Sequence, residues 1–453
     1  MRSFLIRWYI YSLKISILQH DIKKKLLELM DIENQDKNLL TDLFCTAVNS
    51  AKPEKILKDF LPKKAPSRPI ILAVGKAAAS MAKVVEDTWG PCEGIALTRY
   101  GHGVACKGIE VIEAGHPFSD ENSLTGTEKI ISLIDSLAKE DCVYCLISGG
   151  GSSLLCKPRK GIKFSEKQRI FSSLFKKSAP IREINTVRKH LSEIKGGQLS
   201  KFIFPAKVRG FIISDVPGDN PADIASGITT AETTSGLDAL KILKKYRISI
   251  PDQILNILKA ESSVVPPNSK FLSKTENIVI ASGTNSINNA KNYAESLGYT
   301  VKCIGYNLEG DAQLLGKELS KMAIDNQRSM HSDDKPILLL SGGECTVKVL
   351  GSGEGGPNAE FALSAAISLN GRPGISLIAG DTDGIDGKGK AAGAIVTPST
   401  LKKASDINID PRMYLQNSDS HSFFKLIDSQ LITGPTLTNV NDFRAFVIRQ
   451  LRN

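Results

Sequence analysis

The sequence predicts an α/β protein of two domains, each a mainly parallel sheet flanked by helices in a Rossmann-like arrangement. Short apolar runs, rich in β-branched residues, recur along the chain, and most end in a small-residue turn that opens into a helical pattern. Near-continuous apolar strands that alternate with helices are typical of parallel strands covered on both faces. The length of 453 residues also suits two or three domains of about 150 residues each.

Seven strand-and-turn segments follow one another along the chain. They span residues 69–82, 142–155, 208–227, 277–290, 336–347, 375–387 and 430–442. In open parallel sheets the ligand binds beyond the carboxyl ends of the strands. We therefore expect all seven turns to lie at the ligand-binding edge of their sheet.

Two polar stretches, residues 246–271 and residues 325–335, indicate where the chain divides. We expect an N-terminal domain over residues 30–270 and a connecting βα segment over residues 271–332. A C-terminal domain then covers residues 333–453.

Residues 1–29 stand apart from this pattern. Residues 1–20 are apolar and aromatic and contain no acidic residue, but they fall short of the ~20 uninterrupted apolar residues that a membrane span needs. They could form an organelle transit peptide, or the start codon could lie too far upstream. We favour the second interpretation, because a regular amphipathic helix begins at Met30. Since no other segment is apolar over that length, we expect a cytoplasmic protein with no membrane partner.

Composition and charge exclude several classes of function. The chain has 58 Lys and Arg against 48 Asp and Glu, and its net charge is +10. This charge is spread over several segments and forms no basic stripe, so we expect a small anionic substrate and no nucleic-acid partner. The eight cysteines are scattered along a long chain, a pattern that predicts free thiols in a reducing compartment.

The glycine-rich turn after the second strand segment is the best phosphate site in the sequence. Three glycines and two serines there expose backbone N–H groups and hydroxyls at a predicted helix start, which favours phosphate binding. A tight turn between strand and helix is the structural alternative. The predicted nucleotide-binding residues are Ser148, Gly149, Gly150, Gly151, Ser152 and Ser153, with a similar turn at Gly342 and Gly343.

Several basic or imidazole side chains also lie near these turns. Lys76 follows a glycine at the end of the first strand segment, where a cation would meet a bound anion. His116 lies between a glycine and a proline, and Arg188, Lys189 and His190 are consecutive. Such side chains could hold a carboxylate and phosphates, arginine through a bidentate fork. The alternative is that the lysines are solvated and the histidines structural.

The aspartates gather in two clusters. Asp215 and Asp219 lie in the sequence SDVPGD, whereas Asp381, Asp383 and Asp386 lie in GDTDGIDG. Glycine-interrupted loops rich in carboxylates suit Mg²⁺, which takes one or two carboxylates together with phosphate oxygens and water. We predict that the second cluster binds the metal. Asx turns formed by the same aspartates are the structural alternative.

A competing motif lies further along the chain. Gly351, Gly353 and Gly356 follow a predicted strand, precede a predicted helix and have the spacing of a dinucleotide-binding fingerprint, with Asp381 at the end of the next strand. This motif keeps a nicotinamide-dependent reductase open as an alternative function.

The blocks together resemble the glycerate 2-kinase family, whose C-terminal part is the MOFRL domain. The resemblance extends from about Asp31 to Phe446 and rests on LAVGKAAASMA, GHPFSD, LISGGGSSLL, INTVRKHLSEIKGGQL, SDVPGDNPADIASG, GDTDGIDG and TGPTLTNVND. It implies a two-domain α/β enzyme with its active site in the interdomain cleft. The implied reaction transfers the γ-phosphoryl group of ATP to the 2-hydroxyl of D-glycerate and gives 2-phosphoglycerate. Some relatives carry a hydroxypyruvate reductase label.

The resemblance also assigns roles to individual residues. Lys76 matches an active-site lysine of the family and is expected to stabilise charge on the transferring phosphoryl group. Arg188 and Lys189 match the NTVRKH block and are expected to bind the glycerate carboxylate, with His116 and His190 as further substrate-binding residues. Mg²⁺ would bridge the nucleotide phosphates through the second aspartate cluster, and an aspartate of the first cluster would act as a catalytic residue that orients the attacking hydroxyl.

Three positions depart from the family's pattern. The family commonly has GGRNQE where this chain has GGPNAE, so Pro357 and Ala359 replace an arginine and a glutamine. Leu437 replaces a glycine of TGPTGTN. A catalytically reduced protein that binds nucleotide or glycerate without turnover is therefore a third interpretation. A homodimer is compatible with the sequence.

Overall fold

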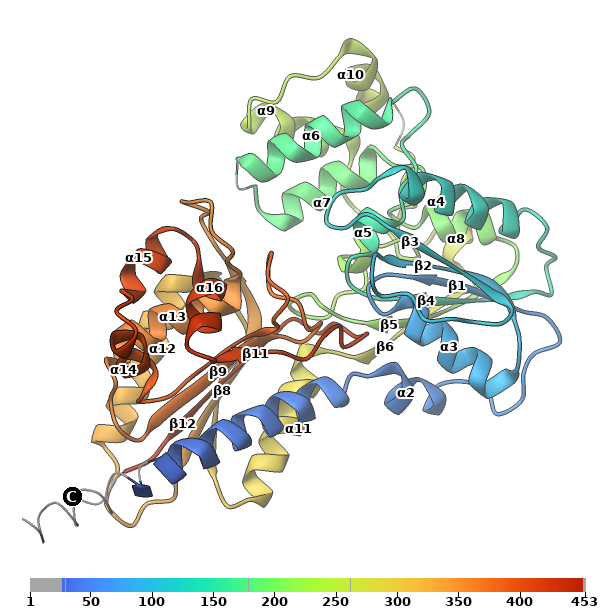
Figure 1. Ribbon diagram of the computed structural model, residues 1–453. Coiled ribbons are helices and arrows are strands. Elements are labelled where there is room, and N and C mark those ends of the chain that lie inside the picture. Colours follow the sequence, from blue (N-terminus) through green and yellow to red (C-terminus); the bar gives the residue numbers. More distant parts are fainter. Residues whose placement is uncertain (1–26, 29, 178, 261, 451–453) are drawn as a thin grey trace, which may run out of the picture.

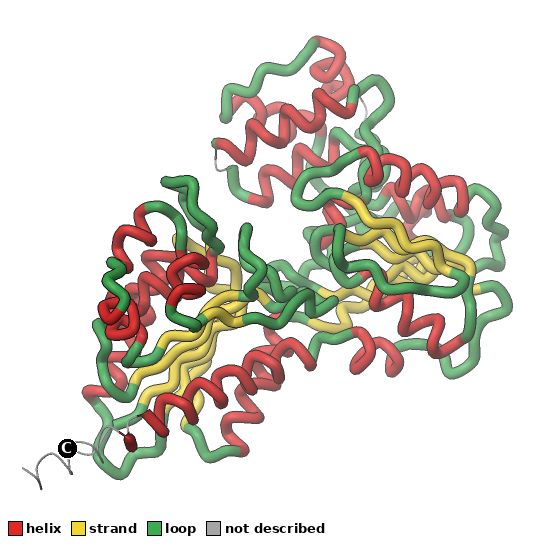
Figure 2. The backbone as a smooth tube through the Cα atoms, in the orientation of Figure 1, coloured by secondary structure: helices red, strands yellow, loops and turns green. Residues whose placement is uncertain are grey.

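The computed structural model describes residues 27–450 except residues 29, 178 and 261, and it contains two six-stranded sheets, each flanked by helices (Figure 1). Figure 2 shows the two sheets as separate groups of strands. The predicted α/β class with two sheet-centred halves is thus confirmed. Most of the segment 1–29 lies outside the described residues. No helix among those described is long and apolar enough to cross a membrane, and all eight cysteines are free thiols as expected.

The first sheet is entirely parallel, with the strand order β3-β2-β1-β4-β5-β6. Its strands are β1 (Pro69–Val74), β2 (Glu93–Arg99), β3 (Ile109–Ala114), β4 (Cys142–Ile147), β5 (Lys207–Ile213) and β6 (Thr275–Ala281). The chain proceeds outward from β1 to one edge and then returns to β4 on the other side of β1. This reversal is a topological switch point, where the turns after β1 and β4 diverge and leave room for a ligand.

Both faces of this sheet are buried, as the alternating side chains of β1 show. Leu72 and Val74 pack into one hydrophobic core and Ile71 and Ala73 into another, because successive side chains of a strand point to opposite faces. The helices around the sheet are α2 (Pro53–Ile56), α3 (Ala78–Trp89), α4 (Glu121–Ile134), α5 (Gly151–Leu154) and α8 (Gln198–Ile203).

Four further helices form a unit of their own beyond this sheet (Figure 1, top). They are α6 (Phe164–Lys176), α7 (Ile181–His190), α9 (Gly236–Lys245) and α10 (Asp252–Lys259). Their apolar faces share a separate core that includes Ile170, Leu174, Val187 and Leu243. The sequence analysis did not separate this helical unit from the rest of the N-terminal half.

The second sheet has the order β11-β10-β9-β12-β8-β7. Its strands are β7 (Thr300–Asp311), β8 (Ile337–Thr346), β9 (Ile375–Asp381), β10 (Gly393–Val396), β11 (Gln430–Leu431) and β12 (Asp442–Ile448). The strands β7, β8, β9 and β11 run in one direction, as the prediction of a mainly parallel sheet requires. Because β12 and β10 run in the opposite direction and lie between strands of this group, β7 and β8 are the only parallel neighbours among the described strands of the second sheet.

The last predicted segment, residues 430–442, therefore differs from the expectation. Its strand β11 has two residues, and the loop 432–441 leads into the antiparallel strand β12 instead of into a helix. The amino end of an antiparallel strand lies at the same edge as the carboxyl ends of its neighbours. The loop consequently still reaches the edge at which the turns were predicted to gather.

The segment 271–332 supplies an outer strand to each sheet. β6 pairs with β5 in the first sheet, α11 (Gly283–Ser296) follows it, and β7 pairs with β8 in the second sheet. The helix α12 (Ala312–Arg328) then precedes β8. The change from one sheet to the other thus falls within α11, inside the segment expected to connect the domains.

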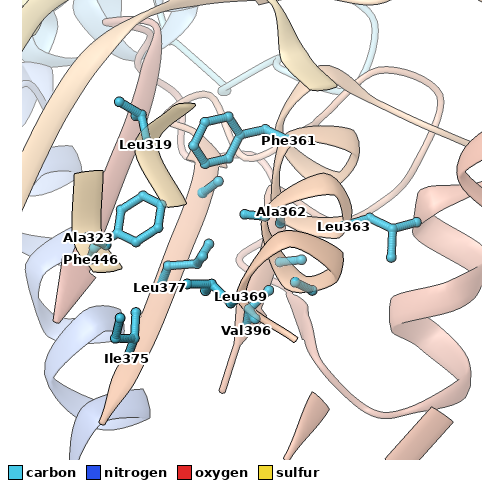
Figure 3. Close-up of a cluster of buried hydrophobic side chains, with 14 of the residues drawn as sticks. Leu319, Ala323, Phe361, Ala362, Leu363, Leu369, Ile375, Leu377, Val396 and Phe446 are labelled. Carbon is cyan, nitrogen blue, oxygen red and sulfur yellow. The ribbon is translucent and has the colours of Figure 1, made fainter. Parts of the chain in front are cut away.

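Both faces of the second sheet are also covered. The helix over residues 30–49 and α11 lie side by side against one face (Figure 1), where Leu40 and Phe44 pack with Ile378 and Phe443. On the other face Phe361 from α13 (Pro357–Leu369) packs near Leu377 and Phe446, as Figure 3 shows. The remaining helices are α14 (Thr400–Asp406), α15 (Pro411–Gln416) and α16 (Ser420–Leu426).

Candidate active site

A cavity of about 370 Å³ lies at the meeting of the two halves and is lined by residues from both. Its volume is in the range of clefts that bind small molecules and cofactors. From the first half come Lys76, His116, Gly150, Ser152, Ser153, Arg188 and Asp215; from the second come Glu344, Pro357, Asn358, Asp381, Asp386, Asn439 and Asp442. Many of these residues follow strands whose carboxyl ends point toward the cavity.

Lys76 lies at the topological switch point of the first sheet. Its backbone N–H donates to the carbonyl of Gly149 at 2.8 Å, which ties the turn after β1 to the turn after β4. Gly75, just before it, has φ +128°, and a Cβ there would lie 2.2 Å from Ser148 Oγ. Only glycine fits so close an approach. The backbone thus directs Lys76 into the cavity.

The side chain of Lys76 reaches the other half of the protein. Its Nζ lies 2.5 Å from Asp383 Oδ2, and Arg99 approaches the same carboxylate at 3.6 Å. Burial alone would lower the pKa of Lys76, but the carboxylates of Asp383 and Asp381 raise it above its ordinary value. The pKa of Asp383 falls below its usual value despite burial, chiefly because Lys76 is close. The site therefore holds a permanently charged lysine.

The glycine-rich loop after β4 divides into residues that pack and residues that line the cavity. Ser148 is fully buried and accepts a hydrogen bond from the Ala77 N–H at 3.0 Å, so it connects the two turns. A Cβ on Gly149 would lie 1.7 Å from Asp215 Oδ2, and one on Gly151 would lie 2.7 Å from the Cβ of Ala225. These three predicted nucleotide-binding residues thus have packing functions in this structure.

Gly150, Ser152 and Ser153 do line the cavity. Gly150 has φ +82°, and a Cβ there would meet His116 at 3.0 Å. The hydroxyl of Ser152 lies 2.7 Å from that of Ser226, and the hydroxyl of Ser153 donates to the Gly150 carbonyl at 3.1 Å. Half of the predicted loop is thus exposed to the cavity.

Gly342 and Gly343 do not form the second anion-binding turn that the sequence predicted. Both lie within β8, and the chain continues as a strand beyond them. A Cβ on Gly342 would lie 2.8 Å from the Tyr306 carbonyl, and one on Gly343 would lie 2.2 Å from that of Leu308. These glycines allow β8 to pass close to the neighbouring backbone of β7.

A group of acidic side chains lines the cavity next to Lys76. Asp215 accepts a hydrogen bond from the Asn439 amide at 2.9 Å, which links the first half to the loop before β12. Burial raises the pKa values of Asp215, Asp381 and Asp442. Desolvation and the nearby Asp442 and Asp215 also raise the pKa of Glu344 to about 7. Glu344 is an exposed residue of β8 whose side chain lines the cavity.

Glu344 was not among the predicted site residues, although it directly follows Gly342 and Gly343. Asp442 and Asn439 were not among them either, because residues that precede a strand were not expected at the ligand-binding edge. Asp219 lines a smaller neighbouring cavity together with Asp215, but it does not line the cavity that holds Lys76.

Of the three consecutive residues predicted on α7, Arg188 alone faces the cavity. It is buried, donates to Asn185 Oδ1 at 2.7 Å and lies over the ring of Phe171. Burial lowers its pKa to about 10. Successive residues of a helix point about 100° apart, so its neighbours in the sequence face elsewhere.

Lys189 and His190 have structural partners instead of a place in the cavity. Lys189 Nζ lies 2.5 Å from Glu232 Oε2, with both side chains buried. His190 contacts the hydroxyl of Thr234 at 3.0 Å and that of Ser262 at 3.2 Å. The geometry thus speaks against the predicted substrate-binding role of both residues.

His116 lines the cavity as predicted, but as a neutral ring. Burial lowers its pKa to about 3, and the positive charges of Lys76 and Arg99 act in the same direction. It can therefore exchange hydrogen bonds with a ligand but supplies no positive charge.

Asp386 caps the amino end of α13. Its carboxylate accepts from the backbone N–H groups of Asn358 at 2.9 Å and Ala359 at 2.8 Å, and His421 Nε2 lies 3.2 Å away. In a dinucleotide-binding fold the pyrophosphate would occupy this helix end. A Cβ on Gly356 would lie 2.3 Å from Asp386 Oδ2, so the glycine accommodates the carboxylate. Because the Asp386 carboxylate occupies this helix end, the glycine motif is not arranged to bind the pyrophosphate of a nicotinamide dinucleotide. The same contacts hold Asp386 in a capping role and argue against it as a metal ligand.

The remaining acidic residues fit a divalent cation that is shared with phosphate oxygens. No group of three or more His, Cys, Asp or Glu side chains arranged to hold a metal occurs among residues 27–450, omitting 29, 178 and 261. Mg²⁺ usually takes only one or two carboxylates and completes its shell with water and phosphate. Desolvation raises the pKa values of Asp381 and Glu344, and neighbouring carboxylates raise both further; a bound cation would neutralise part of this negative charge.

Comparison with known proteins identifies relatives along almost the whole chain. Residues 39–259 match a family described as "Domain of unknown function (DUF4147)", and residues 337–442 match the MOFRL family. A D-glycerate 2-kinase of Thermotoga maritima is 39% identical over 409 residues, which cover 90% of this chain and 97% of that protein. A glycerate 2-kinase of Pyrococcus horikoshii is 38% identical and covers 84% of this chain and 88% of its own.

A third relative, from Agrobacterium vitis, carries a provisional hydroxypyruvate reductase name; it is 41% identical over 91% of this chain and 94% of its own. Among solved structures, a glycerate kinase of Thermotoga maritima superposes with a TM-score of 0.81 at 38% identity. That match covers 92% of this chain and 100% of the solved one. Shared fold, shared length and nearly 40% identity to two glycerate 2-kinases place this chain in the glycerate 2-kinase family.

Proposed function

We propose that this protein transfers the γ-phosphoryl group of ATP to the 2-hydroxyl of D-glycerate and forms 2-phosphoglycerate. The glycerate 2-kinase relatives support the reaction class and the small-molecule substrate. One observation carries the proposal for this chain: the charged Lys76 at the switch point of the first sheet is held by Asp383 of the second half, inside a cavity large enough for small ligands. The eight free thiols suit a reducing compartment such as the cytoplasm.

Phosphoryl transfer depends on positioning and on neutralising charge more than on covalent chemistry. Lys76 is the cation nearest to the switch point, where we place the transferring phosphoryl group. Gly150 and the hydroxyls of Ser152 and Ser153 face the same space and would contact the phosphates or the acceptor. Arg188, buried in the wall of the same cavity, would bind the carboxylate of glycerate.

The attacking hydroxyl must be oriented and must lose a proton during the reaction. Asp215 is the candidate for this step, since its carboxylate lines the cavity and the Asn439 amide fixes its orientation. Asp381 and Asp383 would hold Mg²⁺ with the nucleotide, and the bound ion would neutralise charge on the phosphates. Asp219 lies apart and is not needed for this arrangement.

A coupled assay tests the proposal. The purified protein is incubated with ATP, MgCl₂ and D-glycerate, and the 2-phosphate is detected directly with enolase and pyruvate kinase in the absence of phosphoglycerate mutase. We expect turnover that requires all three additions. Oxidation of NADPH or NADH by hydroxypyruvate without ATP would instead support the reductase. Binding of ATP or glycerate without turnover would indicate that Pro357, in place of the family's usual arginine, has removed catalysis.

A further inference from the structure

A second, smaller cavity of about 30 Å³ adjoins the large one under the helical unit. The two cavities share Pro117, Ser152, Ser153, Phe175 and Arg188 in their walls. The small cavity is otherwise lined largely by apolar groups, among them Phe171. By this measure one water molecule needs about 10–15 Å³, so the pocket has room for about two water-sized groups, such as the two oxygens of a carboxylate, and excludes a triphosphate.

Three buried cations surround this pocket. Lys167 on α6 and Arg188 on α7 line it, and Lys195 lies close enough to both for their charges to interact. Lys167 is 4% exposed and Lys195 0%. Within the described part of the chain, none of the three has an ion pair with a carboxylate, whereas the neighbouring Lys189 has one with Glu232.

The hydrogen-bond partners of these basic side chains are a cysteine sulfur, a backbone carbonyl and an amide oxygen, and none is a carboxylate. Lys167 Nζ donates to the Sγ of Cys156 at 3.3 Å, Lys195 Nζ donates to the Leu155 carbonyl at 2.9 Å, and Arg188 donates to an amide oxygen. Burial lowers the pKa values of both lysines, and the neighbouring cations lower that of Lys195 further. Buried charge without a counter-ion is costly to the fold. Its presence beside the large cavity indicates a site for an anion.

We infer that the small pocket is the carboxylate subsite of the substrate, in which Lys167 and Arg188 bind the acid group, with the buried Lys195 close to both. The identity of the acid rests on the proposed function. In this arrangement Lys167 takes the place that the sequence predicted for Lys189 and binds the carboxylate together with Arg188. Lys167 is then a residue that determines specificity for acids. It predicts that 2-hydroxy acids are accepted and that the corresponding alcohols are rejected.

Substitution of Lys167 by Met tests this inference, because Met has a similar length and no charge. Binding of D-glycerate, glycerol and inorganic phosphate is measured by titration calorimetry without nucleotide, so the result does not depend on turnover. For the wild-type protein we expect D-glycerate to bind at least about tenfold more tightly than glycerol. The K167M variant should lose most of this difference. The control is K244M, which removes an exposed lysine of α9 in the same helical unit.

Thermal unfolding of the same proteins separates a binding role from a structural one. An uncompensated buried cation destabilises the protein, so the unliganded K167M variant should unfold at an equal or higher temperature than the wild type. D-glycerate should raise the unfolding temperature of the wild type more than that of K167M. A structural lysine would instead give a lower unfolding temperature in K167M and unchanged binding.

Four results would overturn the inference: equal binding of D-glycerate and glycerol, undiminished binding by K167M, a lowered unfolding temperature of unliganded K167M, and stronger binding of phosphate than of D-glycerate. The last would assign the pocket to a phosphoryl group. A failure of the proposed kinase function would give a different set of results. In that case D-glycerate binding would still depend on Lys167, but the coupled assay would detect no 2-phosphoglycerate.

Discussion

The ammonium of Lys76 lies 2.5 Å from a carboxylate oxygen of Asp383, and the two residues belong to different halves of the protein. Lys76 follows β1 of the first sheet and Asp383 follows β9 of the second. Their side chains are 11% and 1% exposed, so water screens the pair only slightly. The contact fixes the position of a positive charge in the cavity and joins the halves at the same point.

Replacement of Lys76 by Met should lower kcat by at least about 100-fold, because the charge that stabilises the transferring phosphoryl group is lost. The unfolding temperature should also fall, since Asp383 keeps only the more distant Arg99 as a cation. Steady-state kinetics and thermal unfolding measure the two effects. The control is K83M, which removes an exposed ion pair with Asp87 and should change neither. Wild-type turnover by K76M would exclude Lys76 from the mechanism.

Replacement of Asp381 by Asn should raise the Mg²⁺ concentration needed for half-maximal activity by about tenfold or more, because one of few carboxylate ligands is lost. Replacement of Asp386 by Ala should leave the Mg²⁺ requirement unchanged. It should instead lower the free energy of unfolding by about 1 kcal/mol through loss of the α13 cap. Activity titrated against MgCl₂ distinguishes the two. An altered Mg²⁺ requirement in D386A would return Asp386 to the metal site.

Replacement of Glu344 by Gln should stabilise the protein above neutral pH. The pKa of Glu344 is raised from 4.5 to about 7, so the folded protein holds this proton more tightly than the unfolded chain does. Between these two pH values the wild type loses stability as the pH rises, and E344Q does not. Thermal unfolding of both proteins from pH 4 to pH 8 should show curves that meet at the acidic end and diverge with rising pH. Parallel curves would contradict the raised pKa.

Replacement of Lys189 by Met should destabilise the protein by about 3–5 kcal/mol, because Glu232 is left buried without its partner. Among molecules that remain folded, the KM for D-glycerate should stay close to the wild-type value. Denaturant unfolding measures the first quantity and initial rates the second. In the double variant K189M/E232Q most of the stability should return. A raised KM without loss of stability would restore the substrate-binding role that the sequence predicted.

The features that could be predicted from the sequence have a local cause. The strands β1, β4, β5, β6, β8 and β9 lie in the predicted apolar runs. Lys76 was found because the step from an apolar strand through glycine into a helix is visible in the sequence. Asp215, Asp381 and Asp383 were found for the same reason, since each lies at the carboxyl end of a buried strand or two residues beyond it.

Other features depend on packing that no short segment reveals. The blocks LISGGG and LLSGGE look alike, yet Gly150 in the first adopts φ +82° and begins a helix, while the second continues as strand β8. Of the consecutive residues Arg188, Lys189 and His190, only Arg188 faces the cavity, and the packing of α7 decides this. The reversed direction of β12, which brings Asn439 and Asp442 to the site, likewise has no local signal.

The helix over residues 30–49 packs against the second sheet, although it precedes the first in the chain. In the described part of the chain, the second sheet and its covering helix therefore come from segments that lie before and after the first sheet in the sequence. A fragment made of residues 337–442 alone would lack β7, all of β12 beyond Asp442, and the helix that covers Leu340. Exchange of the C-terminal part between relatives at those limits would separate a sheet from its own covering helix, so a viable chimera must carry the amino-terminal helix along with it.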